Sequence, residues 1–166
     1  FLTVIFDLTI AIEVGLVIAC VLFMRRVMET TEISVIKDEI DPNAELDIAT
    51  NEEHLVIPEG VEVYEINGPY FFGIATKFEE TMAQLGDRPK VRIIRMRKVP
   101  FIDSTGIHNL ETLCHMSQKE KITIVLSGVN EKVHNVLEKS GFYGLLGKEN
   151  ICSNINIALD RAKELL

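Results

Sequence analysis

The sequence predicts an α/β fold, a sandwich of helices around a mostly parallel sheet of four or five strands, preceded by the end of a transmembrane helix. Three observations predict it: an apolar stretch over residues 1–24, an acidic run over 29–53, and alternating strand and helix patterns over 54–166. Strand–helix alternation requires right-handed crossovers, which produce parallel strands. We therefore expect a membrane helix end at 1–28, an acidic linker at 29–53 and a folded domain at 54–166.

The first segment, Phe1–Met24, is apolar almost throughout and is followed at once by Arg25 and Arg26. Twenty-four helical residues reach about 36 Å, enough for a hydrocarbon core of roughly 30 Å. A signal peptide would carry its basic residues first, and the remaining alternative is a buried helix of a soluble protein. We interpret the chain as part of a polytopic membrane protein, cut inside its final span. By the positive-inside rule, the arginine pair indicates that residues 27–166 lie in the cytoplasm.

The net charge of −8 is confined to the segment 29–53, which contains nine acidic residues and a single basic residue, Lys37. The segment 54–166 therefore balances to zero, which argues against a nucleic-acid partner because such a partner needs a basic surface. The acidic run is interpreted as a solvated linker rather than as a specific acidic docking motif.

The domain opens with two strand patterns, 54–57 and 61–66, separated by a tight turn, and we expect them to pair antiparallel. Val91–Met96 reads as a central strand, and the continuous apolar run Ile122–Leu126 as a strand covered on both faces. These two strands should be parallel neighbours, with Leu110 and Val125 in the core.

Four helices complete the pattern. Helical spacing of apolar residues predicts a helix over 74–85 and another beginning near Gly106. Asn130 can cap a third helix that Gly141 ends, and the last helix begins near Ser153. The inward residues expected on these last two helices are Val133, Val136, Leu137, Ile155, Ala158, Leu159, Ala162 and Leu166.

Enzymatic chemistry finds little support in the motifs. Cys20, Cys114 and Cys152 form no CxxC pair, and no metal-ligand spacing exists around them. The glycine-rich segment 141–148 fails as a phosphate loop because Glu149 stands where Ser or Thr is needed. Ser104, His108 and Glu111 are near in sequence without forming a recognised catalytic motif. We expect no enzyme, no cofactor and no metal.

The informative stretch is Val99–Gly106, which follows the central strand and opens a helix. Asp103, Ser104 and Thr105 are all good capping residues, and the N–H groups of a first helical turn favour an anion. A hydroxyl here could accept a phosphoryl group, whereas plain capping is the simpler interpretation. Three basic residues at the strand end could border this loop and make it favourable for anions or nucleotides, or could simply be solvated: Arg95, Arg97 and Lys98.

Three segments together carry a family resemblance. Asp103-Ser104-Thr105-Gly106, approached by Val99-Pro100-Phe101-Ile102, resembles the DSxG loop of STAS domains, which anti-sigma-factor antagonists share with the tails of SulP anion transporters. Phe6–Gly15 resembles the final membrane segment of SulP transporters. Ile66–Gly73 resembles the strand-to-helix turn of their STAS domains. The order of all three segments makes the resemblance specific to the transporter group.

This resemblance implies a STAS sandwich and a role for the chain. The implied function is the cytoplasmic regulatory and protein-interaction domain of a secondary anion transporter of the inner membrane, for sulfate, bicarbonate or dicarboxylates. The alternative is a standalone antagonist that works as a phosphorylation switch, although such a protein has no need of residues 1–26. In antagonists the third loop residue is phosphorylated, which is Thr105 here, and Asp103 matches the acidic residue that orients the loop.

The resemblance also implies partners. We expect the remainder of the transporter's membrane domain, the lipid membrane through residues 1–24, a cytosolic regulatory protein or a nucleotide, and a second copy of the chain as a homodimer.

Overall fold

The computed structural model describes residues 7–29, 32–36, 39–40, 55–70 and 89–166. The chain forms two compact units, which divide between Thr31 and Glu32. The helix predicted over 74–85 lies outside the described residues.

The first unit contains one long helix, α2 (Leu8–Glu29). Asp7 stands at its start, where its side chain accepts a hydrogen bond from the N–H of Leu8 (2.8 Å). The stretch Leu8–Arg26 has a mean hydropathy of 2.2, and none of it is buried within the structure. Its 19 residues reach about 28 Å, close to the thickness of a hydrocarbon core. By length and composition this helix can cross a membrane, as the sequence predicts.

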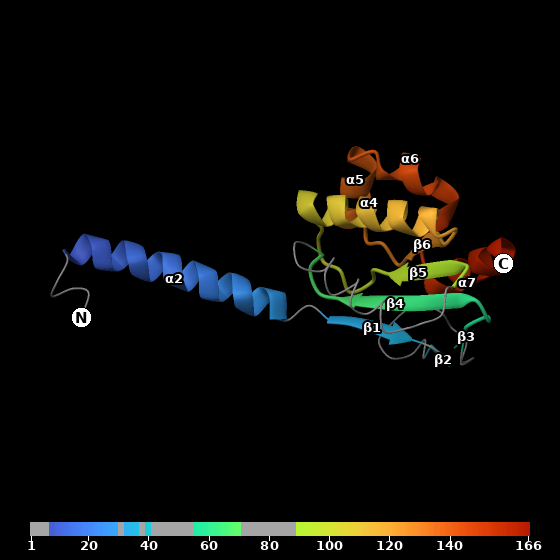
Figure 1. Cartoon of the computed structure of the whole chain (residues 1–166), viewed down its shortest axis with the longest axis horizontal. Helices are drawn as coiled ribbons and strands as arrows, with labels where there is room; N and C mark the ends of the chain where they lie inside the picture. Colours follow the sequence, from blue (N-terminus) through green and yellow to red (C-terminus); the bar gives the residue numbers. More distant parts are fainter. Residues whose placement is uncertain (1–6, 30–31, 37–38, 41–54, 71–88) are drawn as a thin grey trace. The chain divides into compact units, whose positions relative to one another are not determined.

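The second unit is built on a five-stranded sheet (Figure 1). Its strands lie in the spatial order β1 (Glu32–Ile36), β4 (Val61–Asn67), β5 (Val91–Arg95), β6 (Thr123–Ser127) and β7 (Ile151–Cys152). β1 is antiparallel to β4, and all other pairs are parallel. The mostly parallel sheet is confirmed, and so is the parallel pairing of β5 with β6. β5 occupies the centre, where every one of its residues is buried.

The strand beside β4 is not the one that the sequence predicts. The strand predicted over 54–57 appears as the short strand β3 (Leu55–Val56), which pairs with β2 (Glu39–Ile40) in a separate two-stranded sheet. β1, which lies inside the stretch expected to be linker, takes its place. Ile33, Val35 and Ile36 pack against the two cores. Five residues of alternating character are hard to recognise inside a strongly acidic run, which is why the prediction was wrong here.

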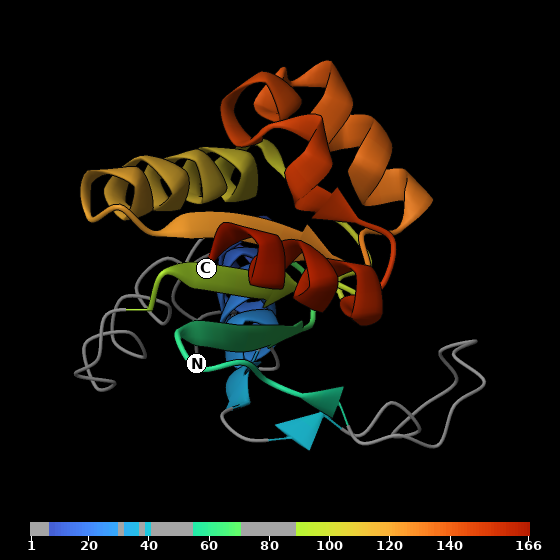
Figure 2. The same cartoon turned by 90° about the vertical axis from the view of Figure 1, so that its right-hand side faces the viewer.

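Helices cover both faces of the sheet (Figure 2). One face carries α4 (Ser104–Lys119), α5 (Glu131–Lys139) and α6 (Phe142–Leu146), and the other carries α7 (Ile155–Leu165). A short 3-10 turn, η1 (Lys148–Asn150), leads into β7. Leu110 and Val125 are fully buried, one in each core, as predicted.

The helix ends largely follow the sequence signals. Asn130 caps α5 by accepting a hydrogen bond from the N–H of Val133 (3.0 Å), and Gly141 stands after it with a φ of 80°. Two predicted core positions are wrong, because Val136 and Leu166 are exposed (37% and 41%). Val136 lies beside the narrow stripe that buries Val133 and Leu137, and Leu166 follows the last residue of α7.

Candidate functional site: the loop before α4

The predicted loop forms the start of α4. Asp103 is the N-cap residue, and its Oδ1 accepts a hydrogen bond from the backbone N–H of Gly106 (2.7 Å). This is the usual bond from an N-cap side chain to the third helical residue. The helix therefore begins at Ser104, two residues earlier than the sequence analysis places it, because Asp103 and not a later residue provides the cap.

Gly106 is buried where two chain segments meet. The backbone N–H of Tyr70 donates to the carbonyl of Phe101 (3.1 Å), and the N–H of Asp103 donates to the carbonyl of Tyr70 (3.4 Å). A Cβ atom on Gly106 would overlap the Tyr70 carbonyl oxygen and would come within 2.9 Å of the Ile102 side chain. The loop is thus fixed on one side by backbone pairing and close packing.

The opposite side of the loop faces solvent. Ser104 and Thr105 are exposed, whereas Ile102 before them and Gly106 after them are buried. Two hydroxyl groups are therefore presented from a fixed backbone at the positive end of a 16-residue helix. Chemically, the arrangement can donate and accept hydrogen bonds with a docking partner, or offer a hydroxyl for covalent modification.

The three basic residues predicted to border the loop have different surroundings. Arg95 is buried, and its Nη1 lies 3.4 Å from Glu65 Oε1. Lys98 Nζ lies 3.8 Å from the other oxygen of the same carboxylate. Arg97 packs against the turn at Gly128, because a Cβ atom added to Gly128 would lie 3.2 Å from the Cβ atom of Arg97. The single carboxylate of Glu65 thus compensates one of the two positive charges at Arg95 and Lys98, which the sequence pattern could not show.

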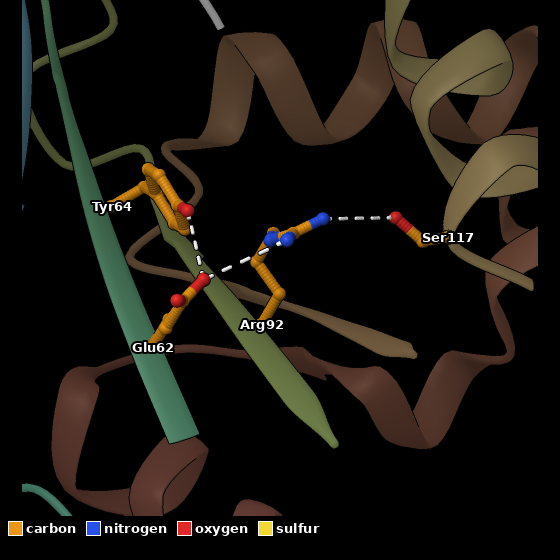
Figure 3. Close-up of polar contacts among 4 residues, drawn as sticks. All are labelled: Glu62, Tyr64, Arg92 and Ser117. Carbon is orange, nitrogen blue, oxygen red and sulfur yellow. Dashed lines mark hydrogen bonds and ion pairs between the residues drawn. The ribbon is translucent and has the colours of Figure 1, made fainter. Parts of the chain in front are cut away.

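A second polar cluster escaped the sequence analysis (Figure 3). Arg92, which is 6% exposed, points between Glu62 and Ser117, with Nη2 3.6 Å from Glu62 Oε2 and Nη1 donating to Ser117 Oγ (3.3 Å). The Tyr64 hydroxyl donates to the same Glu62 oxygen (2.8 Å), and burial raises the pKa of this tyrosine well above its usual value. The signal lay in Glu62 and Arg92, two opposite charges on neighbouring strands. This cluster ties β4, β5 and α4 together.

The described part of the chain offers no metal-binding group of three or more His, Cys, Asp or Glu side chains. Cys114 and Cys152 are buried, and burial raises the pKa of both thiols, in Cys114 to about 12. Both thiols are therefore protonated and poorly nucleophilic at neutral pH.

Comparison with known proteins identifies the family to which this fold belongs. The STAS domain family matches residues 54–158, more than half of the chain. A crystal structure of a sulfate transporter family protein from Wolinella succinogenes is 42% identical, with a TM-score of 0.63 over 70% of this chain and 94% of that one. The STAS domain of a SulP transporter from Vibrio cholerae is 35% identical, with a TM-score of 0.59 over 66% and 85%. The chain belongs to the SulP family and contains its STAS domain.

The similarity extends beyond the STAS domain itself. A candidate sulfate transporter of Bacillus subtilis is 28% identical over 154 residues, which cover 90% of this SulP chain and 26% of that protein. The SulP chain thus spans about a quarter of the length of this relative. Its relatives are transporters and not enzymes, in line with the sequence analysis. The STAS fold and the SulP resemblance predicted from the sequence are both confirmed.

Proposed function

We propose that this chain is the cytoplasmic end of a secondary anion transporter, in which the STAS domain acts as a regulatory and protein-interaction module. The observation that carries the proposal is the presence of two units in one chain. α2 has the length and composition of a membrane span, and a STAS sheet begins within three residues of its end. A standalone antagonist, the alternative function, has no use for such a helix.

The cytoplasmic side is supported by Arg25 and Arg26, which follow the apolar stretch directly. Basic residues accumulate on the cytoplasmic side of membrane spans. The neutral balance of residues 54–166 suits a domain that docks proteins and has no need to attract nucleic acid. The proposed partners are the membrane part of the transporter, surrounding lipid, a second copy of the chain, and a cytosolic regulatory protein or nucleotide.

The proposed interaction surface is the exposed side of the Asp103–Gly106 loop together with Phe101, which is half exposed. Hydroxyl groups at Ser104 and Thr105 give polar specificity beside this apolar side chain. Because the loop backbone is held by Tyr70 and by the Asp103 cap, a partner would meet a preorganised surface and lose little affinity to ordering. A phosphoryl group on Thr105 would change the charge of that surface.

Transport itself is tested with the full-length protein in a bacterial strain that lacks sulfate uptake. Labelled sulfate, bicarbonate and a dicarboxylate are supplied in parallel, and a variant without residues 54–166 is expressed to the same membrane level. We expect uptake of at least one of these anions, with a rate or regulation that changes when the domain is removed. No uptake of any of them by a correctly inserted protein would refute the transporter assignment.

Sidedness is tested by Ser104→Cys in a full-length background from which all native cysteines have been removed. Ser104 is exposed, so a membrane-impermeant thiol reagent should label it in permeabilised cells and leave it unlabelled in intact cells. Equal labelling in intact cells would place the domain on the outer side.

A further inference from the structure

A cavity of about 270 Å³ lies at the end of the domain opposite the Asp103–Gly106 loop. It is open to solvent on one side and is lined by residues of the last turns of α4, the first residues of β6, and the α6–η1 segment. Its floor consists of Cys114, Ile124 and Leu146, which are 2%, 3% and 8% exposed. Gln118, Lys121 and Thr123 also line it and carry polar groups. This volume is close to the lower end of the usual range for ligand pockets, about 300 Å³, which suits a small organic ligand.

Lys121 has an unusual backbone conformation for its residue type. Its φ is +61°, and it is the single non-glycine residue with positive φ among the described residues. Its N–H donates to the Gln118 carbonyl (3.0 Å), and the N–H of Ile122 donates to the Ser117 carbonyl (2.8 Å). This bond pair is the Schellman motif, in which the left-handed position is normally glycine. A strained residue of this kind motivates a functional hypothesis, and Lys121 is among the residues that line the cavity.

The electrostatic setting of the cavity favours a negative headgroup. Among the described residues that line it, Lys121 is a cation and none is acidic. Burial raises the pKa of the Cys114 thiol to about 12, so the floor adds no thiolate charge. One wall is rigid, because Asn150 donates from Nδ2 to the Leu146 carbonyl (2.8 Å) and accepts at Oδ1 from Arg161 Nε (3.1 Å).

From these observations we infer that the cavity binds a small monocarboxylate with a short apolar chain. The carboxylate lies at Lys121, and the chain lies on the floor formed by Cys114, Ile124 and Leu146. A dicarboxylate fits less well, because the apolar floor would leave its second carboxylate without a partner. α4 connects this cavity with the loop at its other end, so the domain carries a ligand site separate from its proposed docking surface.

Hexanoate is the probe, and the isoleucine δ1-methyl groups of the full chain in lipid nanodiscs report its binding by NMR. The Ile124 methyl should shift saturably at millimolar hexanoate, whereas that of Ile93, buried in the core beneath α7, should not. Hexan-1-ol and succinate serve as matched probes that lack the charge or the apolar chain, and both should bind more weakly.

Variants at the cavity mouth separate charge from structure. Lys121→Gln should weaken hexanoate binding roughly two- to fivefold, the range for one partly exposed charge pair, and Lys121→Arg should retain it. Lys121→Gly should weaken binding while the melting temperature stays equal or rises, since glycine adopts this φ without strain. Lys119→Gln, on the exposed surface of the same helix, is the control. An absent Ile124 shift at tens of millimolar hexanoate, or equal binding of hexan-1-ol and hexanoate, would overturn the proposal.

Discussion

The carbonyl oxygen of Tyr70 occupies the space that a Cβ atom on Gly106 would need. Tyr70 follows β4 and Gly106 belongs to the first turn of α4, so this contact joins two connections that lie 36 residues apart in sequence. The parallel bridge between Tyr70 and Ile102 continues the pairing of β4 with β5 past the ends of both strands. The loop that presents Ser104 and Thr105 therefore depends on a glycine for its position.

Gly106→Ala should destabilise the domain by about 1–3 kcal/mol, because overpacking against backbone atoms cannot be relieved by a side-chain rotation. Gly144→Ala is the matched control, since a Cβ there meets nothing within 4 Å and alanine is the better helix former. Urea denaturation of the two variants provides the measurement. Equal stabilities would show that the loop yields easily and is not held by Tyr70.

Leu110→Ala should cost about 2–5 kcal/mol, since Leu110 is fully buried between α4 and the sheet. Val136→Ala, on the exposed side of α5, should change the unfolding free energy by less than about 0.5 kcal/mol. A loss below about 1 kcal/mol for Leu110→Ala would mean that α4 is not packed in this register.

Arg92→Met should cost about 3 kcal/mol, because it leaves the carboxylate of Glu62 beside an apolar group without its cation. This value is the lower end for a buried pair, since the Glu62 side chain keeps 17% exposure. Adding Glu62→Gln should restore part of the loss by removing the uncompensated charge. If the double variant instead lost as much stability as the Arg92→Met and Glu62→Gln single variants added together, the two residues would not be coupled.

Alkaline pH should destabilise the domain through its buried tyrosines. Burial raises the pKa of Tyr70 above its usual value of 10.0, so between pH 9 and 11 the unfolded state loses this proton while the folded state keeps it. The contribution of Tyr70 to the free energy of unfolding is therefore present below pH 10 and is lost as the pH rises. The loss between pH 9 and 11 is about 1.4 kcal/mol. Tyr70→Phe should show a correspondingly shallower decline in denaturation experiments, and an unchanged decline would contradict this account.

The sequence predicts those elements whose signals are local. Val91–Met96 is rich in residues that favour strands, and Ile122–Leu126 is a continuous apolar run of the kind that fills the centre of a parallel sheet. Asp103 and Asn130 are side chains that cap the helix directly after them. These features need no knowledge of distant residues. The STAS resemblance rests on segments that are local in the same sense, Val99–Gly106, Phe6–Gly15 and Ile66–Gly73, which is why the family could be identified from them.

The features that the sequence could not show depend on long-range partners. β1 is recognisable only once β4 is known to need a neighbour, and β7 has two residues, too few for any periodic pattern. The surroundings of Arg95 and Arg92 depend on strand register, which places Glu65 beside Arg95 and Glu62 beside Arg92. A basic residue at a strand end and one in a buried ion pair look alike until that register is known.

The most direct test of the proposed regulatory role is anion uptake by the full-length protein with Thr105→Glu and Thr105→Ala at matched membrane expression. The negative charge that Thr105→Glu introduces is favoured by the helix N-terminus by about 0.3–1 kcal/mol and opposed by Asp103, so the stability of the fold should barely change. Thr112→Glu, exposed on the same helix, is the control. We predict that Thr105→Glu alters uptake while the domain's melting temperature stays nearly constant. Wild-type uptake by both Thr105 variants would show that Thr105 only helps to begin α4.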